Sequence, residues 1–332
     1  MQFTSWREKL TRFFEPYDNR NENKKVVTQK SIPESTMTQG KDDHAYKDGT
    51  IMLFPTNSSH SSQWCLTRES NPNSIPTFST HSHNNYNNKI VRKIEGNRSY
   101  WNIKSGIITY RSSKEKGRSC RLNLFPSTKS QLNDWHSAVK KGYIGSLSDL
   151  KNQEITFVGR LHKKVHKHLE TSIKIRGGYH HSYAPDQAAC IGMSVSHITT
   201  GHAARRAKEL THPIYEYEEL PPKFEFFTQE NVWFGMKVTS WNNNNNNDDN
   251  NNNNKDNSVT NRCYIDPDPF LDDGCLRNNY RLYSEWIDHG NGEKYKEVVN
   301  WAGGVPITIR IDGWDSVDFY ALNAREIMCP CQ

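Results

Sequence analysis

The sequence predicts an all-β protein, a sandwich or jelly roll rather than an α/β fold. Three observations predict this class. Apolar and polar residues alternate with a period of two in several segments, Gly-rich and Pro-rich turns separate those segments, and a helical period is convincing only in short pieces. Many strands with regular turns and few helices are typical of sandwiches and jelly rolls. The absence of a repeat of fixed period in the sequence argues against a propeller or solenoid.

The predicted strands each bury one face, because successive side chains of a strand point to opposite sides of the sheet. In the segment from Ile173 to Arg176, the isoleucines face the core, so Lys174 and Arg176 are expected on the opposite face. The same alternation occurs in two other segments, which bury Ile155, Phe157, Gly159 and Leu161, and Val305, Ile307, Ile309 and Ile311.

A run of Asn interrupts one predicted hairpin. Residues 242–254 contain eleven Asn and two Asp, with no apolar residue, and cannot be part of a core. Strand patterns at Val232–Val238 and Cys263–Ile265 flank the run, which indicates an insertion in the loop that joins two paired strands.

The domain organisation follows from these composition shifts. We expect one jelly-roll domain over residues 44–328, with an Asn-rich insertion at 242–257. Residues 1–43 are polar and are expected to form a mostly disordered arm, and residues 329–332 form a C-terminal tail with Cys329-Pro330-Cys331.

Composition excludes several functions. No run of about 18 apolar residues is present, so we expect no transmembrane helix. The formal charge of +6 comes from basic residues spread along the chain, which argues against nucleic acid as the main partner. The start lacks the apolar core of a secretory signal, so we expect a cytoplasmic protein, or an extracellular one if the gene start is wrong. Phosphate-loop, dinucleotide, zinc-protease and nucleophile-elbow motifs are absent from the sequence.

The densest polar stretch runs from Lys174 to Tyr217. It offers Lys174, Arg176, Lys208 and Glu209 as substrate-binding residues, and His180, His212 and Tyr215 as acid–base candidates. Such residues suit a groove for a sugar or uronic acid, because Arg pairs with carboxylates and Tyr offers a stacking face and a hydroxyl. A solvated sheet face is the alternative. Adjacent strand residues point to opposite faces, so Lys208 and Glu209 cannot both line one groove without a bulge.

An acidic loop is the one candidate metal site. Asp266, Asp268 and Asp272 offer oxygen ligands of the kind that Ca²⁺ prefers, although the loop lacks the EF-hand spacing, and a plain acidic turn is favoured. We expect no other cofactor.

Six segments follow one another along the chain: Asp48–Thr56, Lys174–Tyr179, Ala207–Pro213, Val232–Val238, Tyr280–Tyr283 and Asp312–Ile327. In this order they resemble a group within the concanavalin A-like lectin, glucanase and polysaccharide-lyase superfamily. The resemblance implies a jelly roll of two curved antiparallel sheets that binds carbohydrate in a concave groove. Alginate-lyase-like members carry an Arg-x-Glu-Leu strand, and Ala207 stands where that Arg would be expected.

Three functions remain open from the sequence. The first is a lectin-like protein that recognises a polysaccharide or oligosaccharide. The second is a lyase that cleaves a uronic-acid polymer by β-elimination, with Arg176 or Lys208 neutralising the carboxylate and His180, His212 or Tyr215 as base and acid. The third is a non-catalytic protein-interaction domain. The sequence does not predict the oligomeric state.

Overall fold

The structure is a computed structural model. It describes residues 48–55, 63–66, 70–74, 78–80, 90–109, 114–124, 150–177, 190–197, 204–210, 214–243, 258–299 and 307–328. The chain divides into two units, Met1–Asp43 and His44–Gln332, and all the described elements belong to the second unit.

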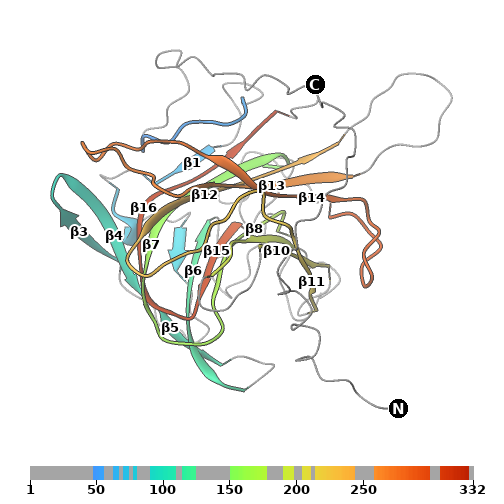
Figure 1. Cartoon of the computed structure of the whole chain (residues 1–332), viewed down its shortest axis with the longest axis horizontal. Coiled ribbons are helices and arrows are strands. Elements are labelled where there is room, and N and C mark those ends of the chain that lie inside the picture. Colours follow the sequence, from blue (N-terminus) through green and yellow to red (C-terminus); the bar gives the residue numbers. More distant parts are fainter. Residues whose placement is uncertain are drawn as a thin grey trace, which may run out of the picture. The chain divides into compact units, whose positions relative to one another are not determined.

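Two antiparallel sheets pack against each other in a β-sandwich, as the sequence predicts (Figure 1). The only helical turn in the described ranges is a 3-10 turn at Pro72–Ser74. The first sheet has the order β14 (Arg281–Asp288), β13 (Val259–Asp266), β12 (Trp233–Asn242), β7 (Gln153–Lys164), β16 (Trp314–Glu326), β4 (Arg98–Lys104) and β3 (Val91–Glu95), and β1 (Gln63–Cys65) also pairs with β16. The second sheet has the order β11 (Glu216–Glu219), β10 (Arg205–Glu209), β9 (Cys190–Ser194), β8 (Glu170–Ile175), β15 (Ile307–Asp312), β6 (Lys116–Leu124) and β2 (Phe78–Thr80), and β5 (Gly106–Thr109) also pairs with β6.

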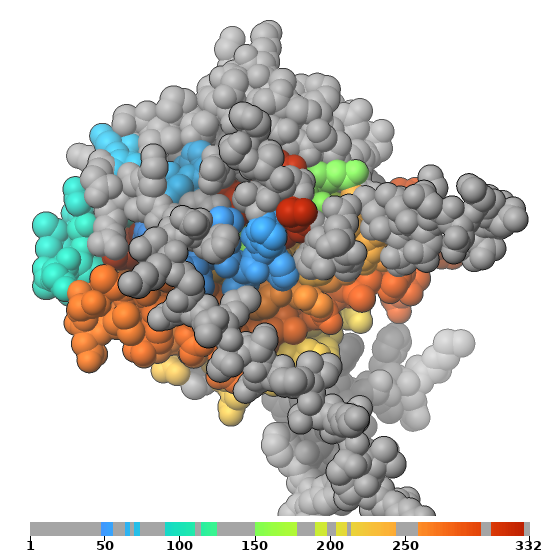
Figure 2. Space-filling view, turned by 90° about the horizontal axis from the view of Figure 1, so that it is seen from above, coloured from blue at the N-terminus to red at the C-terminus, as the bar shows by residue number. Residues whose placement is uncertain are grey.

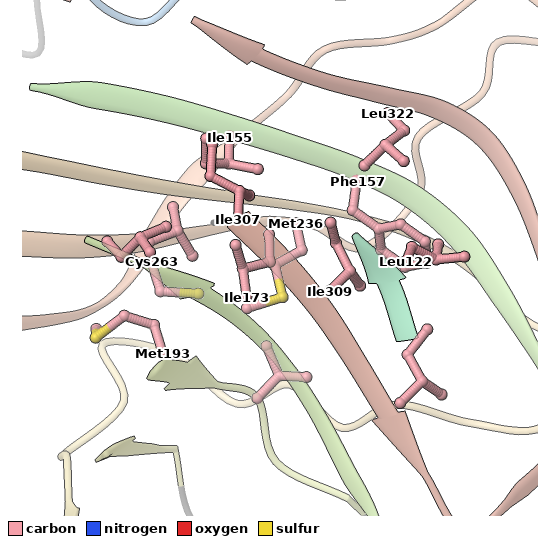
Figure 3. Packing of buried hydrophobic residues seen from close by; sticks show 14 of the residues in the cluster. Leu122, Ile155, Phe157, Ile173, Met193, Met236, Cys263, Ile307, Ile309 and Leu322 are labelled. Carbon is pink, nitrogen blue, oxygen red and sulfur yellow. The ribbon is translucent and has the colours of Figure 1, made fainter. Parts of the chain in front are cut away.

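The core lies between the inner faces of the two sheets. Figure 3 shows apolar side chains from both sheets pointing toward one another, among them Phe157 and Met236 of the first sheet and Ile173 and Ile309 of the second. All four are fully buried. The period-two prediction is confirmed for these strands, because the alternating aliphatic residues are the ones that face the core.

The interrupted hairpin is also confirmed. β12 and β13 pair antiparallel from Gly235 opposite Asp266 to Asn242 opposite Val259. The pairing thus extends to the point where the Asn-rich insertion begins. A hairpin accepts a longer loop at a small entropic cost, because the closure entropy grows only slowly with loop length.

A single residue, Gly313, carries the chain from the second sheet to the first. β15 ends at Asp312 and β16 begins at Trp314. Gly313 has φ +85°, in the left-handed region that favours glycine. A Cβ atom at this position would collide with the carbonyl oxygen of His168, so the corner also leaves no room for a side chain.

The outer face of the first sheet is covered by the segment Asp48–Pro55, coloured blue in Figure 2. Beneath it, the Glu154 carboxylate forms ion pairs with Lys237 at 3.1 Å and with Arg325 at 3.0 Å, and all three side chains are fully buried. The Leu53 amide donates to Glu154 at 3.0 Å. The covering segment therefore seals a buried ion cluster on this face.

Candidate functional site

The outer face of the second sheet gathers polar and charged side chains from six neighbouring strands. The register places Lys174 of β8 beside Gly192 of β9, then Ala207 of β10, then Tyr217 of β11. All four lie on the face opposite the core, because Ile173 and Met193 point inward. We call this surface the polar face. Its charged and aromatic residues are Arg121, Arg310, Asp312, Glu170, Lys174, Arg205, Glu209, Tyr215, Tyr217 and Glu219.

Lys174 and Tyr215 form the pair at the centre of the polar face. The Lys174 ammonium donates to the Tyr215 hydroxyl at 2.9 Å and lies 4.7 Å from the centroid of the same ring. Burial raises the pKa of the Tyr215 hydroxyl well above its usual range, and the neighbouring Cys190 and Glu209 raise it further. Tyr215 therefore keeps its proton at neutral pH.

Cys190 and Glu209 lie beside this pair. The Cys190 thiol donates to the Glu209 carboxylate at 3.4 Å. Burial raises the pKa of Cys190 to about 12, so the thiol stays protonated and is a poor nucleophile. Glu209 is fully buried and contributes negative charge next to the Tyr215 hydroxyl.

Arginines and carboxylates pair in a network on the other side of Lys174. Arg310 bridges Glu170 at 3.2 Å and Asp312 at 2.8 Å. Arg121 pairs with Asp312 at 2.6 Å, and Arg205 with Glu170 at 3.4 Å. Burial alone would raise the pKa of Asp312, but Arg121 and Arg310 hold it well below its usual range. The network is therefore charged at neutral pH.

The polar face carries equal numbers of cations and carboxylates, but the cations are not equally paired. Arg121, Arg310, Arg205 and Lys174 share the face with four carboxylates, those of Glu170, Asp312, Glu209 and Glu219. Within the described residues, Lys174 has no carboxylate in ion-pair distance, and its ammonium is only partly buried. An anionic ligand would therefore find its least compensated partner at Lys174.

Two stacked tyrosines border the face. The rings of Tyr215 and Tyr217 lie 5.5 Å apart with an interplanar angle of 17°, and Tyr217 is 47% exposed. The Arg205 guanidinium lies 4.9 Å from the Tyr217 ring. In the row of paired residues that runs across the strands from Tyr217 to Lys174, the two residues between them are Ala207 and Gly192. These two small residues are therefore flanked by an aromatic ring on one side and a cation on the other.

The structure brings together Lys174, Glu209 and Tyr215 of the residues predicted from sequence. Lys174 lies on β8, Glu209 is the last residue of β10, and Tyr215 lies immediately before β11, which begins at Glu216. His180 and His212 lie outside the described residues.

Arg176 does not line the polar face, contrary to the alternation expected for it. Its backbone has φ 50°, a left-handed conformation that ends β8 and turns the side chain toward the other sheet. Its Nε donates to the Ser240 hydroxyl on β12, and the side chain is fully buried. Arg176 is therefore an interior residue.

Lys208 is also placed on the inner side of its sheet. It lies opposite Ile191, a core residue, and its ammonium pairs with Asp288 of β14 at 2.8 Å. The expectation that Lys208 and Glu209 cannot share a face is confirmed, with Glu209 on the polar face. Neither Arg176 nor Lys208 can neutralise a ligand on the outer surface.

Arg310, Arg121 and Glu170 were missed by the sequence analysis. For Arg310 the signal was present, because Ile307, Ile309 and Ile311 face inward and leave it on the outer face beside Ser172 of β8. The signal was weaker for Arg121 and Glu170, because one of the two residues next to each is not aliphatic, Cys120 and Thr171 respectively.

The acidic loop does not assemble as a cation site in the part of the chain that is described. Both carboxylate oxygens of Asp266 accept backbone amides, from Asp268 at 3.2 Å and Asn279 at 2.8 Å, and Asp268 pairs with Arg277 at 2.9 Å. Among the described residues, no three His, Cys, Asp or Glu side chains converge as metal ligands. The contacts of Asp266 and Asp268 are those of a plain turn, and the calcium expectation for Asp266, Asp268 and Asp272 gains no support from this geometry.

A second cluster lies near the end of the first sheet. His162 contacts Asp318 at 2.5 Å through Nε2 and Asn231 at 2.6 Å through Nδ1. Arg160 donates to Asp318 at 2.8 Å and to Tyr100 at 3.0 Å. Since both His162 nitrogens face acceptors, the imidazolium is held as an ion-pair partner and has no nitrogen left for acid–base work.

Comparisons with known proteins give distant structural likenesses only. No family model matches the chain, and no curated protein matches it in sequence. A botulinum neurotoxin type G receptor binding domain matches with 10% identity and a TM-score of 0.31, over 76% of this chain and 44% of the other. A botulinum neurotoxin serotype D binding domain matches with 11% identity and a TM-score of 0.31, over 76% of this chain and 49% of the other. The chain thus spans just under half the length of these two.

An alginate lyase is also among the similar structures. It was solved in complex with alginate tetrasaccharide, as a double mutant with one lysine and one tyrosine replaced by alanine. It matches with 12% identity and a TM-score of 0.29, over 76% of this chain and 98% of the other. At such distances the likenesses assign no family to this chain. No helix within the described ranges is long and apolar enough to cross a membrane.

Proposed function

We propose that the protein binds an acidic polysaccharide or oligosaccharide across the polar face of the second sheet. The observation that carries the proposal is the partly exposed Lys174 ammonium, which has no carboxylate partner in the described part of the chain and lies in one row with Tyr217. A uronic acid offers both a carboxylate and a ring whose C–H face packs against aromatic side chains.

The surroundings of Lys174 support an anionic ligand rather than a neutral one. The arginines of the network each contact a carboxylate already, so Lys174 is the cation that is left to pair with a ligand. A ligand carboxylate at Lys174 would give this ammonium the ion pair that it lacks among the described residues. Sheet strands hold these groups at fixed positions, which lowers the entropic cost of binding.

Calorimetry with matched oligosaccharides tests the proposal. Oligo-uronates and neutral glucans of equal length are titrated into the protein, and the uronates are expected to bind with an affinity that falls as salt is added. Lys174→Met is expected to weaken binding about tenfold, which corresponds to about 1.4 kcal/mol. Lys93→Met, on the exposed strand β3 of the other sheet, is the control and leaves affinity unchanged.

Equal binding of neutral and acidic sugars would overturn the proposed charge recognition. Absence of binding to every sugar would favour the remaining class, a non-catalytic protein-interaction domain. A Lys174→Met variant with wild-type affinity would move the site away from the polar face.

β-Elimination on the same face is a second candidate, favoured by the 2.9 Å contact of Lys174 and Tyr215. A base removes the proton α to the carboxylate, a C=C bond forms, and the C–O bond to the next sugar breaks as its oxygen takes a proton. Tyr215, protonated at neutral pH, is placed to give that proton, and the Lys174 ammonium to pair with the carboxylate beside the α carbon. The bases predicted from the sequence, His180 and His212, lie outside the described residues.

The ultraviolet absorbance of the unsaturated product tests this candidate. Tyr215→Phe keeps the ring and is expected to abolish turnover while it leaves binding within about tenfold, since a neutral hydrogen bond contributes only about 0.5–1.5 kcal/mol. Absorbance that persists in Tyr215→Phe would exclude Tyr215 as the acid. Binding without absorbance in the wild type would leave the protein as a lectin-like binder.

A further inference from the structure

The guanidinium of Arg176 lies away from the polar face, between the two sheets. The side chain is fully buried, and its Nε donates to the Ser240 hydroxyl. Its Nη1 and Nη2 atoms have no hydrogen-bond partner among the residues that the structure describes. A buried guanidinium with both terminal nitrogens unpaired destabilises the folded state, because each N–H has lost its hydrogen bonds to water without gaining an acceptor in the protein.

The polar side chains that act on Arg176 are engaged in other hydrogen bonds, and none of the described residues accepts a bond from Nη1 or Nη2. Ser240 donates to the Asn261 side-chain oxygen at 2.7 Å. Asp288 is the carboxylate whose charge acts on Arg176, yet one of its oxygens accepts from Lys208 at 2.8 Å and the Gly290 amide at 3.0 Å. Its other oxygen accepts from the Val299 amide at 3.0 Å.

Arg176 differs from its cationic neighbours on β10 because, among the described residues, it has no ion pair. Lys208 pairs with Asp288, and Arg206 pairs with Glu216 and Glu218, so the charge of Arg176 is the one left without a direct counter-ion there. A water molecule could accept hydrogen bonds from Nη1 and Nη2, but it would leave this positive charge without a counter-ion in a low-dielectric interior. A small anion satisfies the donors and the charge together.

We propose that the interior of the sandwich holds a small monovalent anion of the size of chloride, bound by Nη1 and Nη2 of Arg176. The site is built by a strained backbone, since the left-handed conformation of Arg176 directs its side chain inward at the end of β8. The inference is independent of carbohydrate binding, because Arg176 is absent from the polar face.

A chloride titration of thermal unfolding tests the proposal. Sodium chloride replaces sodium gluconate at constant ionic strength, so that screening of surface charges does not change. The Tm of the wild type is expected to rise by about 2–4 °C for each tenfold increase of chloride above its Kd. Arg176→Met is expected to lose this rise, and Arg277→Met, which removes a partly exposed ion pair with Asp268, is expected to keep it.

A Tm of the wild type that does not depend on chloride would overturn the proposal. The same holds if Arg176→Met retains the full chloride dependence. Should Arg176→Met fail to fold, wild-type crystals grown in bromide decide the matter. An anomalous peak within hydrogen-bond distance of Nη1 and Nη2 is the expected result, and a water molecule or empty density there contradicts the proposal.

Discussion

Lys174 and Tyr215, 41 positions apart in the sequence, are joined by a hydrogen bond of 2.9 Å on the outer face of the second sheet. The bond connects β8 to the start of β11 across the width of two intervening strands. It therefore depends on the correct pairing of four strands, and it can be measured as a coupling between two side chains.

A double-mutant cycle measures that coupling. Lys174→Met and Tyr215→Phe each remove one partner, and each is expected to cost about 1–2 kcal/mol of unfolding free energy. The double variant is expected to cost about 1 kcal/mol less than the sum of the two single variants, because either single change already breaks the Lys174–Tyr215 hydrogen bond. Urea denaturation provides the values, and strict additivity would mean that the contact contributes nothing.

The pairing of His162 with Asp318 predicts a dependence of stability on pH. The hydrogen bond to Asp318 raises the pKa of His162 above its ordinary value, although burial opposes the shift. A raised folded-state pKa gives stability that is fully present below the unfolded-state pKa of about 6.5 and is lost as the pH rises through the folded-state value.

We therefore expect His162→Gln to cost about 1–2 kcal/mol at pH 6 and progressively less above neutrality. Chemical denaturation of both proteins at a series of pH values gives the difference. A cost that is constant from pH 6 to pH 9 would show that the histidine is not protonated in the folded protein.

Replacement of the corner glycine is expected to be far more damaging than replacement of a turn glycine. Gly313→Ala combines a left-handed φ with a backbone clash and is expected to cost about 3 kcal/mol or more. Gly96 has φ 61°, and no atom of the described residues lies within 4 Å of the place that a Cβ would take, so Gly96→Ala pays only the backbone penalty of about 1 kcal/mol. Thermal unfolding compares the two, and equal costs would contradict the steric argument.

Loss of Glu154 is expected to exceed loss of Lys237. Glu154→Gln leaves two buried cations without their shared carboxylate and is expected to cost about 3–5 kcal/mol, whereas Lys237→Met leaves Glu154 paired with Arg325. Glu285→Gln, in a partly exposed pair with Arg262, is the control and is expected to cost under about 1 kcal/mol. Unfolding in urea ranks the three, and the reverse order for Glu154 and Lys237 would contradict the assignment of Glu154 as the shared partner.

The sequence predicts the sheets better than the site. Alternation identifies the inward face of β8 and β15 because burial of isoleucine dominates those strands, and it places Lys174 correctly. It fails at Arg176, where one left-handed residue reverses the direction of the side chain. Local patterns carry no signal for such a reversal, since Arg has no preference for that conformation.

Contacts between strands that are distant in the sequence are even harder to predict from local sequence patterns. His162 meets Asp318, 156 positions away, because β7 and β16 are neighbours in the first sheet. No local pattern specifies that two such strands pair. The polar face has the same origin, since its arginines come from β6, β10 and β15, which are far apart in the sequence and share one sheet only in the folded protein.

The position of the corner at Gly313 has a consequence for the order of folding during synthesis. β15 and β16 are the last two strands of the described chain, and each lies inside its sheet, β15 between β8 and β6, and β16 between β7 and β4. Until residues 307–326 leave the ribosome, both sheets lack an interior strand and present unpaired edges on either side of the gap. The sandwich therefore closes late, and nascent chains depend on protection of those edges against aggregation until the final strands arrive.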